Sequence, residues 1–213
     1  MSGLFLVLEG IEGAGKTTQA ARLAAWLEGL GIKVAATREP GGTAVGETVR
    51  AVLLDHAGID VPPECELLLV LAARAAVVRE VVRPALARGE MVVADRFSLS
   101  TLAYQGHGRR LDLAKVRRLD AFARGGLEPD LTLLLDLSLE EGIRRQQAAG
   151  KKSDRIERAS RAFHDRVAAG YRALAQAGGD RIRVVDARST PEAVHEQVRA
   201  VLRERFPGAF APA

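Results

Sequence analysis

Apolar residues along the chain gather in short runs that alternate with longer amphipathic stretches. Five runs are apolar at nearly every position, as strands must be when helices cover both faces of a parallel sheet. They are expected at 4–8, 33–37, 91–95, 131–137 and 182–186. Helical patterns between them are expected at about 16–30, 46–57, 64–88, 112–125, 138–149, 155–177 and 191–205. This alternation predicts an α/β fold, a three-layer doubly wound arrangement around a parallel five-stranded sheet.

Turn and capping residues support several of these boundaries. Gly31 and Gly89 follow two of the expected helices, and Pro191 stands in the first turn of the last one. Asp154 and Glu157 have the spacing of a cap for the long helix that follows them. We see no internal repeat and no linker, so the sequence predicts a single domain over residues 1–213.

Composition narrows the set of partners. The net charge is +4, but basic residues are scattered and aromatic residues are only 4% of the chain, which argues against a nucleic-acid platform. No apolar run reaches the ~18 residues of a membrane span, so no membrane partner is expected. Cys65 is the single cysteine, which excludes an intrachain disulfide and a cysteine zinc cluster. These features favour a cytoplasmic protein.

A glycine-rich loop follows the first expected strand and precedes a helix. Its sequence GIEGAGKT, residues 10–17, fits the pattern G-x-x-x-x-G-K-[ST]. In such a P-loop, backbone N–H groups converge on phosphate, the lysine reaches the β- and γ-phosphates and the hydroxyl can bind Mg²⁺. The pattern indicates a nucleoside triphosphate. Its expected contacts are Gly10, Ile11, Glu12, Gly13, Ala14, Gly15, Lys16, Thr17 and Thr18.

A carboxylate at the end of a neighbouring strand is expected to hold Mg²⁺, partly through water, together with Thr17. Two strands end in aspartate, at Asp95 and at Asp136. Spacing alone does not choose between them. Arg96 follows Asp95 and would place a cation beside the carboxylate where two phosphates must meet, which favours Asp95.

Four further motifs make the chain resemble the bacterial thymidylate kinases. They are TREPGGT (37–43), DRF (95–97), STLAYQG (100–106) and DRIE (154–157). The resemblance runs from about residue 4 to 205. It implies a nucleoside monophosphate kinase-like P-loop fold and a homodimer. It also implies transfer of the γ-phosphoryl group of ATP to dTMP, which gives dTDP and ADP during dTTP synthesis for DNA replication.

The resemblance also implies roles on the phosphate side of an acceptor pocket. Arg38 and Glu39 would line the pocket, and Arg96 would bind the phosphate of dTMP. Arg50 would be a further contact to the phosphate or the base. Glu12 stands where the family has an acidic residue near the acceptor sugar.

A second group of residues would read the nucleoside of dTMP. By the resemblance, Arg74 would bind the edge of the thymine, and Thr101 and Gln105 would contact the base. Tyr104 would lie against the sugar and favour deoxyribose. Thr101, Tyr104 and Gln105 share one face of a helix by their spacing. Val70 stands where the family usually has a phenylalanine that stacks on thymine.

Basic residues return in the segment at about 144–158, which is expected to be a lid over ATP. The P-loop here has no arginine, and in such family members the lid supplies the cation. Gln146, Gln147, Ala148 and Ala149 replace arginines that relatives often carry. The acting residue is open among Arg145, Lys151, Lys152 and Arg155. Arg155 is favoured because it lies in the DRIE motif, so Lys16, Arg38, Asp95, Arg96 and Arg155 form the expected catalytic set.

Two other classes of protein stay open at this point. One is a kinase for another nucleoside monophosphate or for a deoxynucleoside. The other is a nucleotide switch, although the guanine-reading pattern N-K-x-D is missing from the sequence. No histidine or aspartate base is needed for the kinase reaction, because a phosphate acceptor is already ionised at neutral pH, with a second pKa near ~6.

Overall fold

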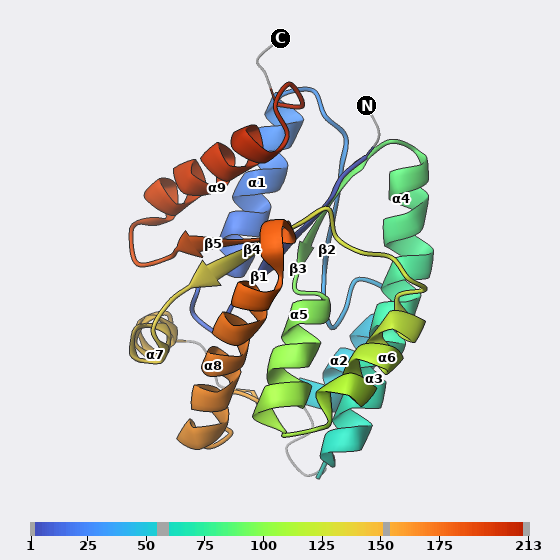
Figure 1. Cartoon of the computed structure of the whole chain (residues 1–213), viewed down its shortest axis with the longest axis vertical. Coiled ribbons are helices and arrows are strands. Elements are labelled where there is room, and N and C mark those ends of the chain that lie inside the picture. The colour runs from blue at the N-terminus through green and yellow to red at the C-terminus, as the bar shows by residue number, and fades with distance from the viewer. Residues whose placement is uncertain (1–2, 55–59, 151–153, 211–213) are drawn as a thin grey trace.

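The computed structural model describes residues 3–54, 60–150 and 154–210. Five parallel strands form one sheet in the order β2-β3-β1-β4-β5 (Figure 1). The strands are β1 (Phe5–Glu9), β2 (Val34–Arg38), β3 (Met91–Asp95), β4 (Leu131–Asp136) and β5 (Ile182–Asp186). All five strand predictions are confirmed to within one residue at each end, and so is the predicted fold class.

Helices cover both faces of the sheet, with α1 and α9 on one face and α4, α5 and α8 on the other (Figure 1). Within the described residues, no helix combines the length and the apolar character that crossing a membrane would require. The α-helices are α1 (Lys16–Gly29), α2 (Ala44–Leu54), α3 (Pro63–Val77), α4 (Arg83–Ala87), α5 (Ser98–Thr101), α6 (Leu113–Ala123), α7 (Leu139–Ala148), α8 (Arg161–Ala177) and α9 (Pro191–Arg205).

The central strand β1 contributes to two of the three hydrophobic clusters that the described residues form. Phe5 and Val7 pack with Val78 on one face of the sheet, whereas Leu6 and Leu8 belong to the cluster that includes α1 and α9. Alternate residues of a strand point to opposite faces, so a strand covered on both sides must be apolar throughout. The polar residues of the sheet are therefore concentrated at its carboxyl edge.

Three regions of the structure differ from the predicted helices. The helices expected from the sequence leave 98–108 without a helix, although residues 101, 104 and 105 have helical spacing. Here α5 continues into a π-helical segment, Leu102–Gly108, in which the Arg109 amide donates to the Tyr104 carbonyl at 2.8 Å. A second π-helical segment, Val78–Val82, joins α3 to α4 within the long helix expected at 64–88.

The long helix expected from residue 155 begins later, at Arg161. Its N-cap is Ser160, whose hydroxyl accepts from the Phe163 amide. Asp154 and Glu157 do cap each other's backbone amides, at 2.8 and 3.2 Å, but they close a separate turn. The capping pattern was therefore read correctly and assigned to the wrong element.

Candidate active site

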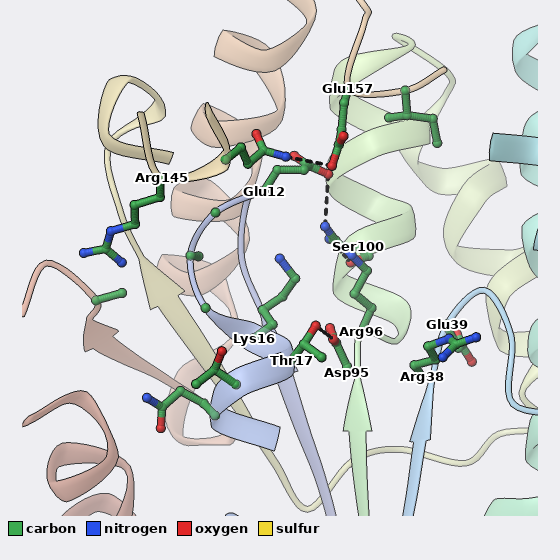
Figure 2. Close-up of a pocket in the computed structure, with 18 of the residues that line it drawn as sticks. Glu12, Lys16, Thr17, Arg38, Glu39, Asp95, Arg96, Ser100, Arg145 and Glu157 are labelled. Atoms are coloured by element: carbon green, nitrogen blue, oxygen red, sulfur yellow. Dashed lines mark hydrogen bonds and ion pairs between the residues drawn. The ribbon is translucent and has the colours of Figure 1, made fainter. Parts of the chain in front are cut away.

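A cavity of about 750 Å³ lies at the carboxyl edge of the sheet, over the ends of β1 and β3. Most residues that the sequence analysis selected line it (Figure 2). They are Glu12, Gly13, Ala14, Gly15, Lys16, Thr17, Thr18, Arg38, Glu39, Arg50, Val70, Arg74, Asp95, Arg96, Thr101, Tyr104 and Gln105. Gly10, Ile11 and Arg155 were also selected but do not line the cavity.

Strand register brings three sequence motifs to this edge. Asp95 at the end of β3 lies opposite Leu8 of β1 and opposite Arg38 of β2. The backbone then continues the pairing, because the Glu39 amide donates to the Asp95 carbonyl and the Arg96 amide donates to the Leu8 carbonyl, both at 2.9 Å. The P-loop, TREPGGT and DRF therefore meet at one point.

Two glycines of the P-loop, Gly10 and Gly13, lie close against the backbone of neighbouring elements. Gly13 has a φ of 77°, and a Cβ atom there would collide with the backbone of Gly142 in α7. A glycine is therefore required at residue 13 both by the turn and by the close approach of α7. The Lys16 ammonium lies inside the loop and donates to the Ile11 carbonyl at 2.7 Å.

Charges around the loop are closely coupled. Burial lowers the pKa of Lys16 to about 8, Arg96 acts in the same direction, and Glu12 opposes them. For Glu12, burial raises the pKa, but Arg96, Lys16 and the Tyr104 hydroxyl outweigh it, so the pKa lies below its ordinary value. An anion bound at the loop would favour the charged form of Lys16 by the same physics.

Thr17 and Asp95 meet at the base of the cavity (Figure 2). The Thr17 hydroxyl donates to Asp95 Oδ2 at 2.6 Å, so two oxygen ligands of the kind that Mg²⁺ prefers are already adjacent. Asp136, the alternative, is not among the residues that line the cavity, and its carboxylate lies 3.8 Å from the Arg172 guanidinium. The geometry favours Asp95.

Four side chains hold the guanidinium of Arg96. Its Nη2 atom donates to Glu12 at 3.0 Å and to the Tyr104 hydroxyl at 3.4 Å. Its Nη1 atom donates to Ser100 at 3.0 Å and to the Tyr171 hydroxyl at 3.1 Å. The backbone φ of Arg96 is 76°, in the left-handed region that residues other than glycine seldom adopt. Arg96 is thus fixed at the cavity wall by both its backbone and its side chain.

Glu9, which the sequence analysis did not select, anchors this wall from below. Its fully buried carboxylate accepts from the amides of Phe97 and Ser100, both at 2.9 Å. It also accepts from the Ser100 hydroxyl at 2.5 Å and from the Tyr171 hydroxyl at 3.0 Å. These four bonds fix the backbone that follows Arg96 and tie it to α8. The signal for Glu9 in the sequence is its position, because it is a charged residue directly after an apolar run.

Arg74 is almost completely buried, with 1% of its surface exposed. Its Nε and Nη2 atoms donate to Glu39 Oε2, at 2.9 and 2.5 Å. Its Nη1 atom donates to Thr101 at 2.8 Å and to Asp120 of α6 at 2.5 Å. The sequence indicated that an arginine on an apolar stripe needs a partner, and the structure supplies Glu39 and Asp120.

Glu39 carries an unusual carboxyl group. Burial raises its pKa to about 7 despite the attraction of Arg74. Its Oε1 atom is buried and has no hydrogen-bond partner among the described residues. The Glu39 carboxyl group at the cavity wall beside Arg74 therefore holds its proton more strongly than an ordinary glutamate does.

The lid candidates lie in different places. Arg145 lines the cavity on the side of the P-loop away from Arg38 (Figure 2) and donates to Glu141 at 2.9 Å. Arg155, which the sequence analysis favoured, instead donates to Glu66 of α3 at 2.6 Å and to the Leu53 carbonyl at 2.8 Å. Lys151 and Lys152 lie outside the described residues.

Comparisons with known proteins agree with this geometry. The family model described as thymidylate kinase matches residues 8–198. The thymidylate kinase of Thermomicrobium roseum is 51% identical over 200 residues, which is 94% of this chain and 94% of the relative. That of Gloeobacter violaceus is 50% identical over 200 residues, 93% of this chain and 94% of the relative. The crystal structure of the Ehrlichia chaffeensis enzyme superposes with a TM-score of 0.78, at 31% identity, and covers 95% of this chain and 100% of that one.

The chain belongs to the thymidylate kinase family. Members of this family phosphorylate dTMP to dTDP with ATP in the synthesis of dTTP. Beyond the motifs of the thymidylate kinases, the cavity also includes residues of the loop after β5 and the start of α9, Arg188, Ser189, Thr190 and Pro191. No motif in the sequence predicts this wall. Its position after the last strand was the only signal for it.

We expect replacement of Glu39 by glutamine to remove a pH dependence of stability. The folded-state pKa of about 7 lies above the ordinary glutamate value of 4.5, so the folded state binds the additional proton. Wild-type stability should therefore fall as the pH rises from about 4.5 to 7, by at most about 3 kcal/mol for this group. Urea unfolding at several pH values would measure the slope.

Glu47→Gln is the control for that experiment. Glu47 is exposed and its pKa is lowered, first by the Gly42 amide, so its titration lies below the pH window in question. The Glu39→Gln protein should have a flatter profile than wild type and than Glu47→Gln. Three parallel profiles would contradict the assignment of a raised pKa to Glu39.

Proposed function

We infer that this chain transfers the γ-phosphoryl group of ATP to the 5′-phosphate of dTMP. Family membership supports the reaction, and one structural observation supports its location. A single cavity runs from the P-loop to the buried guanidinium of Arg74, so donor and acceptor can occupy one continuous space. The donor side would extend from Lys16 toward Arg145, and the acceptor side from Arg96 toward Arg74.

Catalysis would rest on position and charge. The attacking oxygen belongs to a phosphate that is ionised at neutral pH, so a base is not needed, and the obstacle is the approach of two polyanions. Lys16, Arg38 and Arg96 would supply positive charge at the point of transfer. We assign the lid cation to Arg145 in preference to Arg155, because Arg145 lines the cavity whereas the guanidinium of Arg155 contacts α2 and α3.

The nucleoside of dTMP would lie between α3 and the π-helical segment. Arg74 has five N–H groups, and four of them donate to Glu39, Thr101 and Asp120. The fifth N–H group could donate to a ring carbonyl, which thymine has. It could not donate to an exocyclic amine at the same place on another base. Val70 lies one turn before Arg74, has 9% of its surface exposed and lines the same cavity, so its methyl groups would contact the base.

Mg²⁺ fits the base of the cavity. Thr17 Oγ1 and Asp95 Oδ2 would hold it, in part through water, while phosphate oxygens complete the shell. The described residues contain no cluster of three or more histidine, cysteine or acidic side chains arranged for a metal. A magnesium ion that is held mainly by nucleotide phosphates requires few protein ligands. When bound, the ion would neutralise charge on the transferred phosphoryl group.

Exposed apolar side chains support a homodimer. Phe122 has 86% of its surface exposed, Leu119 40% and Leu68 58%. The first two lie on α6 and the third on α3, and the two helices pack side by side. Large exposed apolar residues on neighbouring helices are typical of interaction surfaces. We propose that this surface pairs with a second copy of the chain.

We also propose that the chain is one domain, with a lid at about 144–158, and that it acts in the cytoplasm.

A panel of acceptors tests the function. With ATP and Mg²⁺, dTMP should give the highest kcat/KM, and ADP should form in step with dTDP. Activity with dUMP should be lower by ~10- to 200-fold, the range for one missing methyl group in an apolar pocket. A coupled ADP assay with dTMP, dUMP, dCMP, AMP and GMP would measure it. Higher activity with AMP or GMP than with dTMP would contradict the proposal.

Paired substitutions test the metal ligands. Asp95→Asn should lower kcat by about 10- to 100-fold and raise the Mg²⁺ concentration for half-maximal activity, as loss of a water-mediated ligand does. Asp136→Asn is the matched control, a strand-end aspartate outside the cavity, and should change neither value more than about twofold. The reverse ranking would move the magnesium site to β4.

The proposed dimer surface is tested by Phe122→Lys. A charge at its centre should shift the protein from dimer to monomer in sedimentation velocity, because a desolvated ammonium without a partner is costly. Val184→Lys is the control, since Val184 is 55% exposed on β5, away from α3 and α6. Equal behaviour of both variants and wild type would remove α6 from the interface.

A further inference from the structure

Glu66 of α3 is a buried carboxylate outside the cavity, and three side chains donate to it. Gln105 Nε2 donates to its Oε1 atom at 2.9 Å. Arg109 donates to both of its oxygens, at 3.1 and 2.9 Å, and Arg155 donates to Oε2 at 2.6 Å. Glu66 has no exposed surface. With two guanidinium partners, the group is ionised and acts only as an acceptor.

The contact with Glu66 determines which way the Gln105 amide points. Gln105 lies in the π-helical segment, is 3% exposed and lines the acceptor side of the cavity. An ionised carboxylate cannot donate, so only the NH₂ end of the amide can face Glu66. The Gln105 carbonyl oxygen is then the amide atom turned away from α3. It is not among the buried polar atoms that lack a partner.

The neighbouring polar group has no such constraint. The Thr101 hydroxyl accepts from Arg74 and can still rotate its own proton toward a ligand. It can therefore adapt to a base that donates or to one that accepts. An amide held by a carboxylate cannot adapt without losing a buried hydrogen bond to a charged group, which costs more than a neutral one. Of the two, Gln105 is the side chain able to discriminate.

We propose that Glu66 is a positioning residue for acceptor specificity, which acts by holding the Gln105 carbonyl oxygen toward the base. That oxygen would accept from a ring N–H, as thymine and uracil present at N3. Cytosine presents a lone pair at the same atom and would be repelled. The proposal rests on the proposed function, since it names the feature of the acceptor that the site reads.

Glu66→Gln tests the proposal, because it keeps the shape of the side chain and removes the fixed acceptor. The amide of Gln105 is then free to turn over. We expect the ratio of kcat/KM for dTMP to that for dCMP to fall by at least about tenfold, and the same fall in the ratio of their dissociation constants by calorimetry. The dissociation constants are measured without ATP, because Arg155, which also contacts Glu66, belongs to the proposed lid.

Matched variants separate orientation from mere stability. Arg109→Gln removes another partner of Glu66 and leaves the contact with Gln105, so the dTMP to dCMP ratio should stay near that of wild type. Gln105→Met should lower the ratio as Glu66→Gln does, and the double variant should be no worse than Gln105→Met alone. If Glu66→Gln does not fold, the double variant Glu66→Gln with Arg109→Gln takes its place in the experiment. It leaves one fewer buried charge without a partner.

The outcomes distinguish this inference from the proposed function. A wild-type protein that does not prefer dTMP over AMP and GMP would refute the function itself. A wild-type protein that prefers dTMP, together with a folded Glu66 variant that keeps the full dTMP to dCMP ratio, would overturn the role of Glu66 alone. A Glu66 variant with a lower melting temperature and an unchanged ratio would likewise show that Glu66 only stabilises the fold.

Discussion

A buried carboxylate at the end of the central strand organises the whole carboxyl edge of this structure. Glu9 has no exposed surface, so its charge must be compensated by hydrogen bonds within the fold. Those bonds come from the backbone after β3, from Ser100 of α5 and from Tyr171 of α8. Because Arg96 lies between the strand end and these anchored groups, the bonds to Glu9 also position Arg96, which is proposed to bind the acceptor phosphate.

Most cations of the site are paired with carboxylates of the protein itself. Arg96 pairs with Glu12, Arg38 with Glu47 and Arg145 with Glu141. Each cation is therefore oriented before substrates arrive. In the proposed reaction, these cations would exchange their carboxylate partners for the phosphates of the two nucleotides. The site can thus bind strongly charged substrates without leaving a high positive charge unpaired in their absence.

The sequence was sufficient for the sheet, the P-loop and most of the cavity wall. Buried parallel strands are apolar on both faces, and the P-loop has a fixed spacing, so both are local signals. The site of Arg155 could not be predicted, since its partner Glu66 lies 89 residues earlier. Glu9, Asp120 and Tyr171 were missed for the same reason. Each is a single polar residue whose partners come together only when the helices pack on the sheet.

The π-helical segment Leu102–Gly108 sets a limit on how the gene can vary. Its hydrogen bonds enclose one residue more than an α-helical turn does, as the bond from the Arg109 amide to the Tyr104 carbonyl records. Loss of one codon here would restore ordinary helical closure and turn each later side chain by ~100° about the axis. Gln105 would then leave the register that relates it to Thr101. The length of this stretch is therefore constrained as well as its residue types.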